Sequence, residues 1–197
     1  MAMDVPPLAE PASLAMKPLK PEDISKKYRE KISTQSYAKR DLIEGVKILE
    51  LKRFLGEDGS FLEMARFSEG KIEGLEEFEV AQVSYSEVLP GAIKAWHLHF
   101  SQEDVWFVPP NARLLVGLWD VREKSPTTDQ KMRLIMGDGK AQLVYIPRGV
   151  AHGAANLWDK AAEIIYFVNN QFDPQNPDEQ RLAWDAAGKN FWELVKG

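Results

Sequence analysis

The feature that most constrains the fold is a series of short segments between Val46 and Val168 in which apolar and polar residues alternate. Alternation with a period of two places successive side chains on opposite faces of an extended chain, as in half-buried β-strands. Turns rich in Gly, Pro, Asn and Asp separate the segments VKILELKRFL, FLEMARF, EEFEVAQVSYS, AIKAWHLHF, ARLLVGLWDV, AQLVYI and AEIIYFV. Because no helical periodicity intervenes, the sequence predicts an all-β, antiparallel sandwich or barrel.

The two ends of the chain have a different composition. Prolines stand at positions 6, 7, 11, 18 and 21, and proline lacks a backbone donor, so residues 1–25 are predicted to form an extended arm. A short helix is expected over PEDISKKYREKI, in which acidic residues precede basic ones. The barrel is assigned to residues 26–175. Residues 176–197 are assigned to a helical segment packing on it, because PDEQRLAWDAAG starts with acids and stops at glycine.

Composition excludes several classes of function. The chain has 25 Lys and Arg against 30 Asp and Glu, a net charge of -5, which argues against a nucleic-acid partner. It has no cysteine, so disulfides, thiolate nucleophiles and Cys-ligated metals are excluded. No apolar run suits a membrane span and the first residues lack a signal-peptide pattern, so we expect a cytoplasmic protein without a membrane partner.

The chain's 3 histidines carry the strongest motif. His97 and His99 lie two apart in AIKAWHLHF, so in a strand they share one face with Ile93 and Ala95. His152 follows a tight turn in PRGVAHGAAN. The spacing resembles the two cupin motifs, G-x5-H-x-H-x3-E and P-x-G-x2-H-x3-N, at Gly91, His97, His99, Glu103, Pro147, Gly149, His152 and Asn156. The resemblance implies a cupin-type double-stranded β-helix, that is, a jelly-roll barrel whose His and Glu residues converge on one metal.

A more specific resemblance covers Ile43 to Trp192. DGSFLE, AQVSYSEVLPGAIKAWHLH, DVREKSPTT, YIPRGVAHG, AEIIYF and RLAWDAAGKNFWE occur in the order of similar segments in the dTDP-4-dehydrorhamnose 3,5-epimerases. These enzymes are cupins that need no metal. Their chemistry is proton abstraction next to a 4-keto group of a nucleotide sugar, with a base, an enolate-stabilising group and an acid.

The resemblance also implies roles for individual residues. His97 would be the base, Asp185 its orienting carboxylate and Tyr166 the acid. His152 would line the site beside the keto group. Contacts to base, sugar or diphosphate would come from Phe61, Glu63, Gln82, Lys94 and Arg148. Since homologous epimerases are dimers, a homodimer is expected.

Several positions depart from the family pattern. Lys94 replaces an arginine and so loses the bidentate fork for phosphate. Asp58 replaces another arginine, Val105 replaces the lysine expected to steady the enolate, and His99 replaces a glutamine. Cations are therefore lost and metal-ligand types gained in the same pocket.

Two alternatives follow from these departures. One is a metal-dependent oxygenase or isomerase that binds Fe, Mn, Ni or Zn through His97, His99, Glu103 and His152. The other is a sugar-binding relative without catalysis. We favour an epimerase without a cofactor, because Tyr166 and Asp185 have no role in a metal centre. The metal and epimerase interpretations exclude each other, since a metal-bound His97 has no free lone pair.

Overall fold

The computed structural model describes residues 17–36 and 41–195, and the chain divides into two compact units between positions 40 and 41. The first unit contains a 3-10 turn, η1 (Pro21–Asp23), and one helical turn, α1 (Lys26–Arg29). Both lie within the predicted helix. Most of the predicted proline-rich arm lies outside the described residues. The barrel unit begins at Asp41 rather than at residue 26, because α1 and the residues after it bury no side chain.

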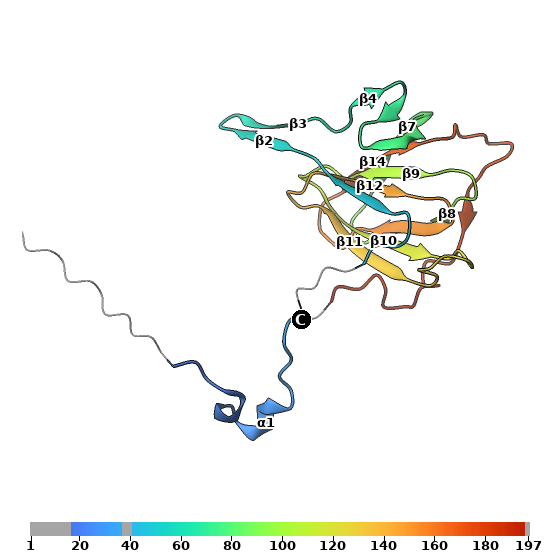
Figure 1. Ribbon diagram of the computed structural model, residues 1–197. Helices are drawn as coiled ribbons and strands as arrows, with labels where there is room; N and C mark the ends of the chain where they lie inside the picture. Colours follow the sequence, from blue (N-terminus) through green and yellow to red (C-terminus); the bar gives the residue numbers. More distant parts are fainter. Residues whose placement is uncertain (1–16, 37–40, 196–197) are drawn as a thin grey trace, which may run out of the picture. The chain divides into compact units, whose positions relative to one another are not determined.

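The second unit is a barrel of two five-stranded antiparallel sheets (Figure 1). The first sheet has the order β1 (Lys47–Glu50), β12 (Gln142–Ile146), β9 (Asp104–Phe107), β14 (Ala162–Val168) and β7 (Gln82–Val88). The second has the order β11 (Lys131–Gly137), β10 (Arg113–Asp120), β13 (Val150–Ala155), β8 (Ile93–Leu98) and β15 (Gln180–Arg181). This arrangement confirms the predicted all-β jelly roll.

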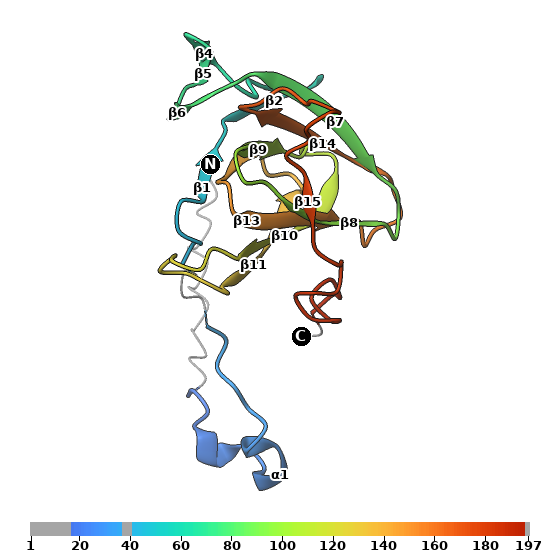
Figure 2. The same ribbon diagram turned by 90° about the vertical axis from the view of Figure 1, so that its right-hand side faces the viewer.

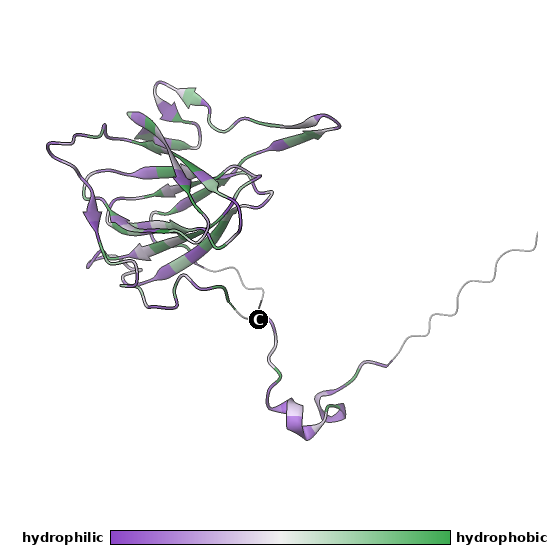
Figure 3. Cartoon of the chain, turned by 180° about the vertical axis from the view of Figure 1, so that it is seen from behind, coloured by the Kyte–Doolittle hydropathy of each residue, from purple (hydrophilic) through white to green (hydrophobic). Residues whose placement is uncertain are grey.

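The main core lies between the two sheets. It combines Trp106, Val144 and Ile164 of the first sheet with Val116 and Leu118 of the second. Strands such as β10 and β11 contribute alternate residues to this core, and Figure 3 shows hydrophilic and hydrophobic bands along the strands. Polar side chains that face the interior are therefore exceptions, and they mark a site.

Each sheet also has a covered outer face. A three-stranded meander, β4 (Phe67–Ser68), β5 (Lys71–Ile72) and β6 (Leu75–Glu79), buries Phe78 against Val105 and Phe107 on the outside of the first sheet. The C-terminal segment covers the second sheet, and Trp192 stacks at 4.8 Å between ring centroids on Trp96. These two segments bury part of each outer face, while Val83 and Tyr85 of β7 stay exposed.

The prediction of a helical C-terminal segment is wrong. Described residues after position 176 form β15 and a series of hydrogen-bonded turns, with no helix (Figure 2). β15 extends the second sheet beside β8, pairing Gln180 with Leu98 and Arg181 with His97. Phe191 and Trp192 are neighbours in sequence and both pack on Trp96, whereas a helix would point consecutive residues about 100° apart.

A separate hairpin, β2 (Arg53–Gly56) with β3 (Gly59–Leu62), projects from the barrel in Figure 1. It exposes Leu55 (78%) and Phe61 (66%) together with Phe54. Among the described residues no helix is long and apolar enough to cross a membrane.

Candidate functional site

A cavity of about 820 Å³ is lined by residues from both sheets. Strand β8 and the residue after it supply His97 and His99, and β13 supplies His152. The opposite sheet supplies Tyr166 from β14 and Asp104 from β9. All 3 histidines of the chain therefore meet in one cavity, as the motif spacing predicts.

The pairing of β8 with β13 is irregular beside the cavity. The register shifts between His152 and Ala154, and such a shift changes which side chains share a face. Lys94 and His97 consequently both line the cavity, while Ile93 and Ala95 pack in the outer cluster around Trp96. The expectation that Ile93 and Ala95 share the face of His97 is therefore wrong.

His97 is held as a neutral imidazole. An Arg181 N–H lies 3.1 Å from His97 Nε2, and Glu179 Oε1 lies 3.2 Å from Nδ1. Because guanidinium can only donate, the lone pair is assigned to Nε2 and the proton to Nδ1. Burial, together with neighbouring His152 and Arg181, lowers the pKa of His97 to about 4, although Glu179 acts in the opposite direction.

Tyr166 lies in the sheet opposite His97 and keeps its proton. Burial, and then the negative charge of Asp104, raise the pKa of the Tyr166 hydroxyl, while a hydrogen bond with Ser84 opposes them. Gln82 is nearby on the cavity wall and its amide donates to Ser84 Oγ at 2.9 Å. The cavity thus presents a neutral base on one side and a protonated acid on the other.

The other two histidines surround a buried carboxylate. Asp104 is 3% exposed, and its oxygens lie 3.9 Å from His99 Nε2 and 3.5 Å from His152 Nε2. Gln102 Nε2 donates to Asp104 Oδ1 and Trp106 Nε1 to Oδ2, each at 2.9 Å. Burial alone would raise the pKa of Asp104, but His152, His99 and Trp106 together hold it well below its usual range. The carboxylate is therefore ionised.

The structure does not assemble the metal set proposed from the sequence. Glu103, just before β9, has its side chain beside Tyr145; burial raises the pKa of the Tyr145 hydroxyl, and the charge and hydrogen bond of Glu103 raise it further. Among the described residues the group with metal-ligand geometry is His99, Asp104 and His152, without His97. Asp104 was missed because the motif spacing selects position 103, while the pleat of β9 turns position 104 inward.

Four predicted site residues lie elsewhere, the orienting carboxylate and three contact residues. Asp185 is in a turn that ends at Gly188 and does not line the cavity; Glu179, just before β15, takes the place beside His97. Arg148 is exposed in the turn before β13. Phe61 is on the projecting hairpin, and Glu63 pairs with Arg66 at 2.9 Å. Gln82, Lys94 and His152 do line the cavity.

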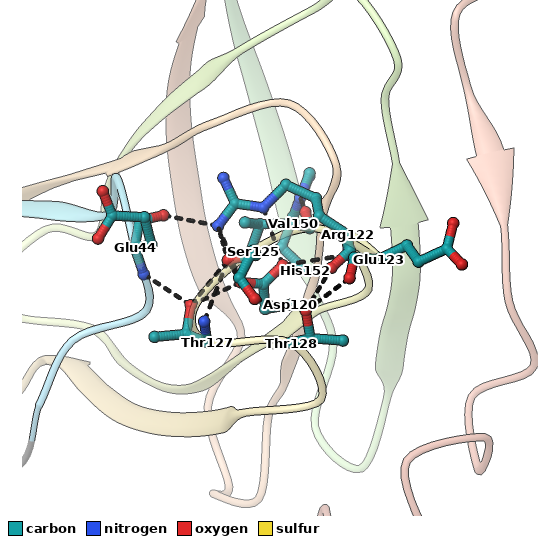
Figure 4. A network of polar contacts seen from close by, with 9 residues as sticks. All are labelled: Glu44, Asp120, Arg122, Glu123, Ser125, Thr127, Thr128, Val150 and His152. Carbon is teal, nitrogen blue, oxygen red and sulfur yellow. Dashed lines mark hydrogen bonds and ion pairs between the residues drawn. The ribbon is translucent and has the colours of Figure 1, made fainter.

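The DVREKSPTT segment has a structural role behind the site (Figure 4). Asp120, which is fully buried, accepts hydrogen bonds from Arg122, Ser125 and Thr127 at 2.6 to 2.9 Å. Arg122 also donates to the carbonyl of Glu44 at 2.7 Å. The network joins the β10–β11 connection to the residues before β1 and so fixes the end of the strand pair β10–β13.

Comparison with known proteins identifies relatives across the barrel unit. The family model of dTDP-4-dehydrorhamnose 3,5-epimerase matches residues 40–192. The spore coat polysaccharide biosynthesis protein SpsL of Bacillus subtilis is 38% identical over 144 residues, which are 73% of this chain and 91% of that protein. The probable low-salt glycan biosynthesis epimerase Agl13 of Haloferax volcanii is 35% identical over 101 residues, 51% of this chain and 65% of the relative.

Solved structures have the same fold. The dTDP sugar isomerase from Desulfovibrio desulfuricans G20 is 27% identical, with a TM-score of 0.64 over 78% of this chain and 91% of the other. The enzyme from Legionella pneumophila, crystallised with dTDP-4-keto-L-rhamnose, is 24% identical and has a TM-score of 0.65 over 79% of this chain and 82% of its own. The latter similarity supports the fold alone.

Proposed function

Because the chain belongs to the dTDP-4-dehydrorhamnose 3,5-epimerase family, we propose that it epimerises a nucleotide-linked 4-keto-6-deoxy sugar in the synthesis of a polysaccharide or deoxysugar. The observation that carries the proposal is the pairing, in one cavity, of a neutral His97 and a protonated Tyr166 from opposite sheets. Epimerisation requires this arrangement, since one face of a carbon loses a proton and the other face gains one.

The reaction starts at a carbon next to the keto group. His97 Nε2 takes the proton, the electrons of the C–H bond form the enolate double bond, and the keto oxygen takes the negative charge. Glu179 lies 3.2 Å from His97 Nδ1 and stabilises the imidazolium that results. Tyr166 then gives its hydroxyl proton to the opposite face of the same carbon.

Arg181 has to leave His97 before the base can act, since it occupies the lone pair of Nε2. Its side chain is 54% exposed, so rotation toward a bound diphosphate costs little packing. We propose that the substrate draws Arg181 away and thereby frees the base. Lys94, which lines the same cavity and contacts Ser86 at 2.9 Å, is a second candidate cation for the diphosphate.

The proposed assembly is a homodimer. The β2–β3 hairpin exposes Phe54, Leu55 and Phe61 on a two-stranded sheet, and no other strand of the described residues pairs with it. Exposed apolar side chains on an isolated hairpin are suited to a protein interface. In such a dimer, we propose that Phe61 on the hairpin and Glu63 just after it make their predicted substrate contacts in the partner's cavity.

Exchange of solvent deuterium into the sugar tests the proposal. Wild-type protein with dTDP-4-keto-6-deoxyglucose in D2O should incorporate deuterium at C3, C5 or both, as measured by proton NMR. His97→Asn should abolish exchange while leaving the thermal unfolding midpoint unchanged. Binding of the substrate without exchange in the wild type would instead indicate a sugar-binding protein without catalysis.

A further inference from the structure

We infer that His99, Asp104 and His152 bind one divalent transition-metal ion inside the epimerase cavity. Each is buried, with exposures of 7%, 3% and 2%, and each offers one ligand atom within 4.8 Å of the others. Two imidazoles and one carboxylate form a donor set for ions such as Zn2+ or Fe2+. The catalytic part of this inference, but not the binding, rests on the proposed function.

The orientation of both imidazoles supports a ligand role. His152 Nδ1 lies 3.0 Å from the carbonyl of Val150 (Figure 4), and His99 Nδ1 contacts the carbonyl of Asp178. Since a carbonyl only accepts, both Nδ1 atoms carry the proton and both Nε2 atoms present lone pairs toward Asp104. This is the arrangement of metal-binding histidines, in which the second ring nitrogen donates to a carbonyl or carboxylate.

The distances fit an ion better than direct hydrogen bonds. The Nε2–oxygen separations of 3.5 and 3.9 Å exceed the 2.7–3.2 Å of ordinary N–H···O bonds. Two ligands at about 2.05 Å from a tetrahedral ion lie about 3.3 Å apart. These two separations are to different oxygens of Asp104, Oδ2 for His152 and Oδ1 for His99, and the ligand atoms of the group lie within 4.8 Å of one another, so the side chains would close on a bound ion. With the protons on Nδ1, neither Nε2 has a hydrogen to donate to Asp104, and His99 Nε2 also lies 3.4 Å from the Gln102 amide nitrogen.

The surroundings of the Asp104 carboxylate also fit a ligand role. Within residues 17–36 and 41–195, its ion-pair contacts are with His99 and His152, and no Lys or Arg pairs with it. Gln102 and Trp106 hydrogen-bond its two oxygens, which orients the carboxylate as outer-shell partners orient metal ligands.

The site leaves His97 free. The base has its own partners, Glu179 and Arg181, and is absent from the metal-binding group. Proton abstraction and metal binding can therefore coexist, in contrast to the ligand set expected from the sequence. The ion faces the same cavity, where it can stabilise the negative keto oxygen. Val105 has its side chain in the outer cluster and does not line the cavity, so the expectation that it replaces a cation of the same pocket is wrong.

Direct measurement of Zn2+ binding tests the site without any substrate. Full-length protein stripped with chelator should bind about one Zn2+ per chain by equilibrium dialysis and elemental analysis. Asp104→Asn and His99→Gln should each weaken binding at least 10-fold, since even loss of an outer-shell partner costs 10- to 100-fold. His97→Gln is the matched control, because it removes a histidine of the same cavity and should bind Zn2+ like the wild type.

The thermal unfolding midpoint, measured with and without Zn2+, is a second test that does not depend on the ligand variants folding well. Zn2+ should raise the unfolding midpoint of wild type and His97→Gln, because a ligand that binds the folded state stabilises it. Absence of stoichiometric Zn2+ binding in the wild type, or equal loss in His97→Gln, would overturn the inference. If the wild type binds no Zn2+ but still exchanges deuterium into the sugar, the metal site is wrong and the epimerase proposal stands. If it binds Zn2+ but exchanges deuterium into no 4-keto sugar, the metal site stands and the epimerase proposal is wrong.

Discussion

Glu179 and Asp185 are two carboxylates on the C-terminal segment, and only Glu179 contacts the base. Its Oε1 atom lies 3.2 Å from His97 Nδ1, and it also pairs with Arg181. A carboxylate in this position fixes the tautomer of the imidazole and stabilises its cation, and loss of the equivalent group in other enzymes lowers kcat strongly.

We therefore predict that Glu179→Gln lowers kcat at least about 10-fold, with little change in thermal stability. The amide keeps the size of the side chain but not its charge. Asp185→Asn is the control and should leave kcat unchanged. Steady-state kinetics on a 4-keto nucleotide sugar would measure both, and an effect confined to Asp185→Asn would restore the assignment made from the sequence.

The residue scale also shows what the sequence could predict. His97, His99, His152 and Tyr166 meet as expected, because motif spacing within strands fixes which residues face inward. Asp104 and Glu103 exchange roles since a shift of one residue in a strand moves a side chain to the opposite face, and motif spacing does not resolve where β9 begins. Glu179 could not be found, because its contact depends on β15 pairing with a strand far away in sequence.

At the scale of elements, the buried Asp120 network holds three segments together. Three side chains donate to its carboxylate, and Arg122 links it to the residues before β1 (Figure 4). Burial alone would raise the pKa of Asp120, but the hydrogen bonds from Arg122, Ser125 and Thr127 hold it far below its usual range. A lowered folded pKa means that the ionised carboxylate stabilises the folded state above the unfolded pKa of about 3.9, and that this stability is lost as pH falls.

Asp120→Asn should lower the free energy of unfolding by about 3 kcal/mol at pH 7, the range seen when one partner of a buried ion pair is removed. Below about pH 4 the difference from wild type should shrink, because the Asp120 carboxyl of the unfolded chain takes up a proton there while that of the folded protein stays ionised. Urea unfolding at pH 7 and pH 3 would measure it. A difference independent of pH would contradict the charge assignment.

The attachment of the C-terminal segment depends on a glycine in β10. A Cβ at Gly117 would lie 2.6 Å from ring atoms of Phe191 and Trp192 and 2.9 Å from Trp96. Gly117→Ala should therefore destabilise the protein by about 1–3 kcal/mol, as overpacking does. In the double variant with Trp192→Phe the loss should be smaller than the two single losses combined, since the smaller ring makes room. Thermal unfolding would compare the variants, and full additivity would mean that the rings do not meet the new methyl group.

The strands themselves were predictable because they are short β-branched or aromatic segments between turns, and some, such as β7, alternate along their length, although β9 and β13 are buried throughout. The structure of the C-terminal segment was not predictable in this way. Acidic residues followed by glycine are typical of the start and end of a helix, but they do not show which surface the segment packs against. Here the aromatic residues cover the outside of a sheet, and that requirement selects turns over a helix.

At the scale of the whole molecule, the apolar hairpin β2–β3 predicts the oligomeric state. Light scattering should give twice the chain mass of 22.3 kDa for the wild type. The double variant Leu55→Asp with Phe61→Asp should be a monomer, because two charges would be buried in the interface. Leu194→Asp is the control, since Leu194 is also exposed (57%) but lies on the C-terminal segment. A wild type of 22.3 kDa would exclude the dimer.

The imidazoles of His99 and His152 are anchored to main-chain carbonyls rather than to side chains. Substitutions elsewhere leave such anchors in place as long as the backbone keeps its path. Asp178 fixes that path for the loop after β8, because its carboxylate accepts the backbone N–H groups of Phe100, Ser101 and Gln102. As related barrels diverge, a substitution at position 104 alone can therefore create or remove the ion site. Two proteins with the same backbone in this region need not both bind a metal.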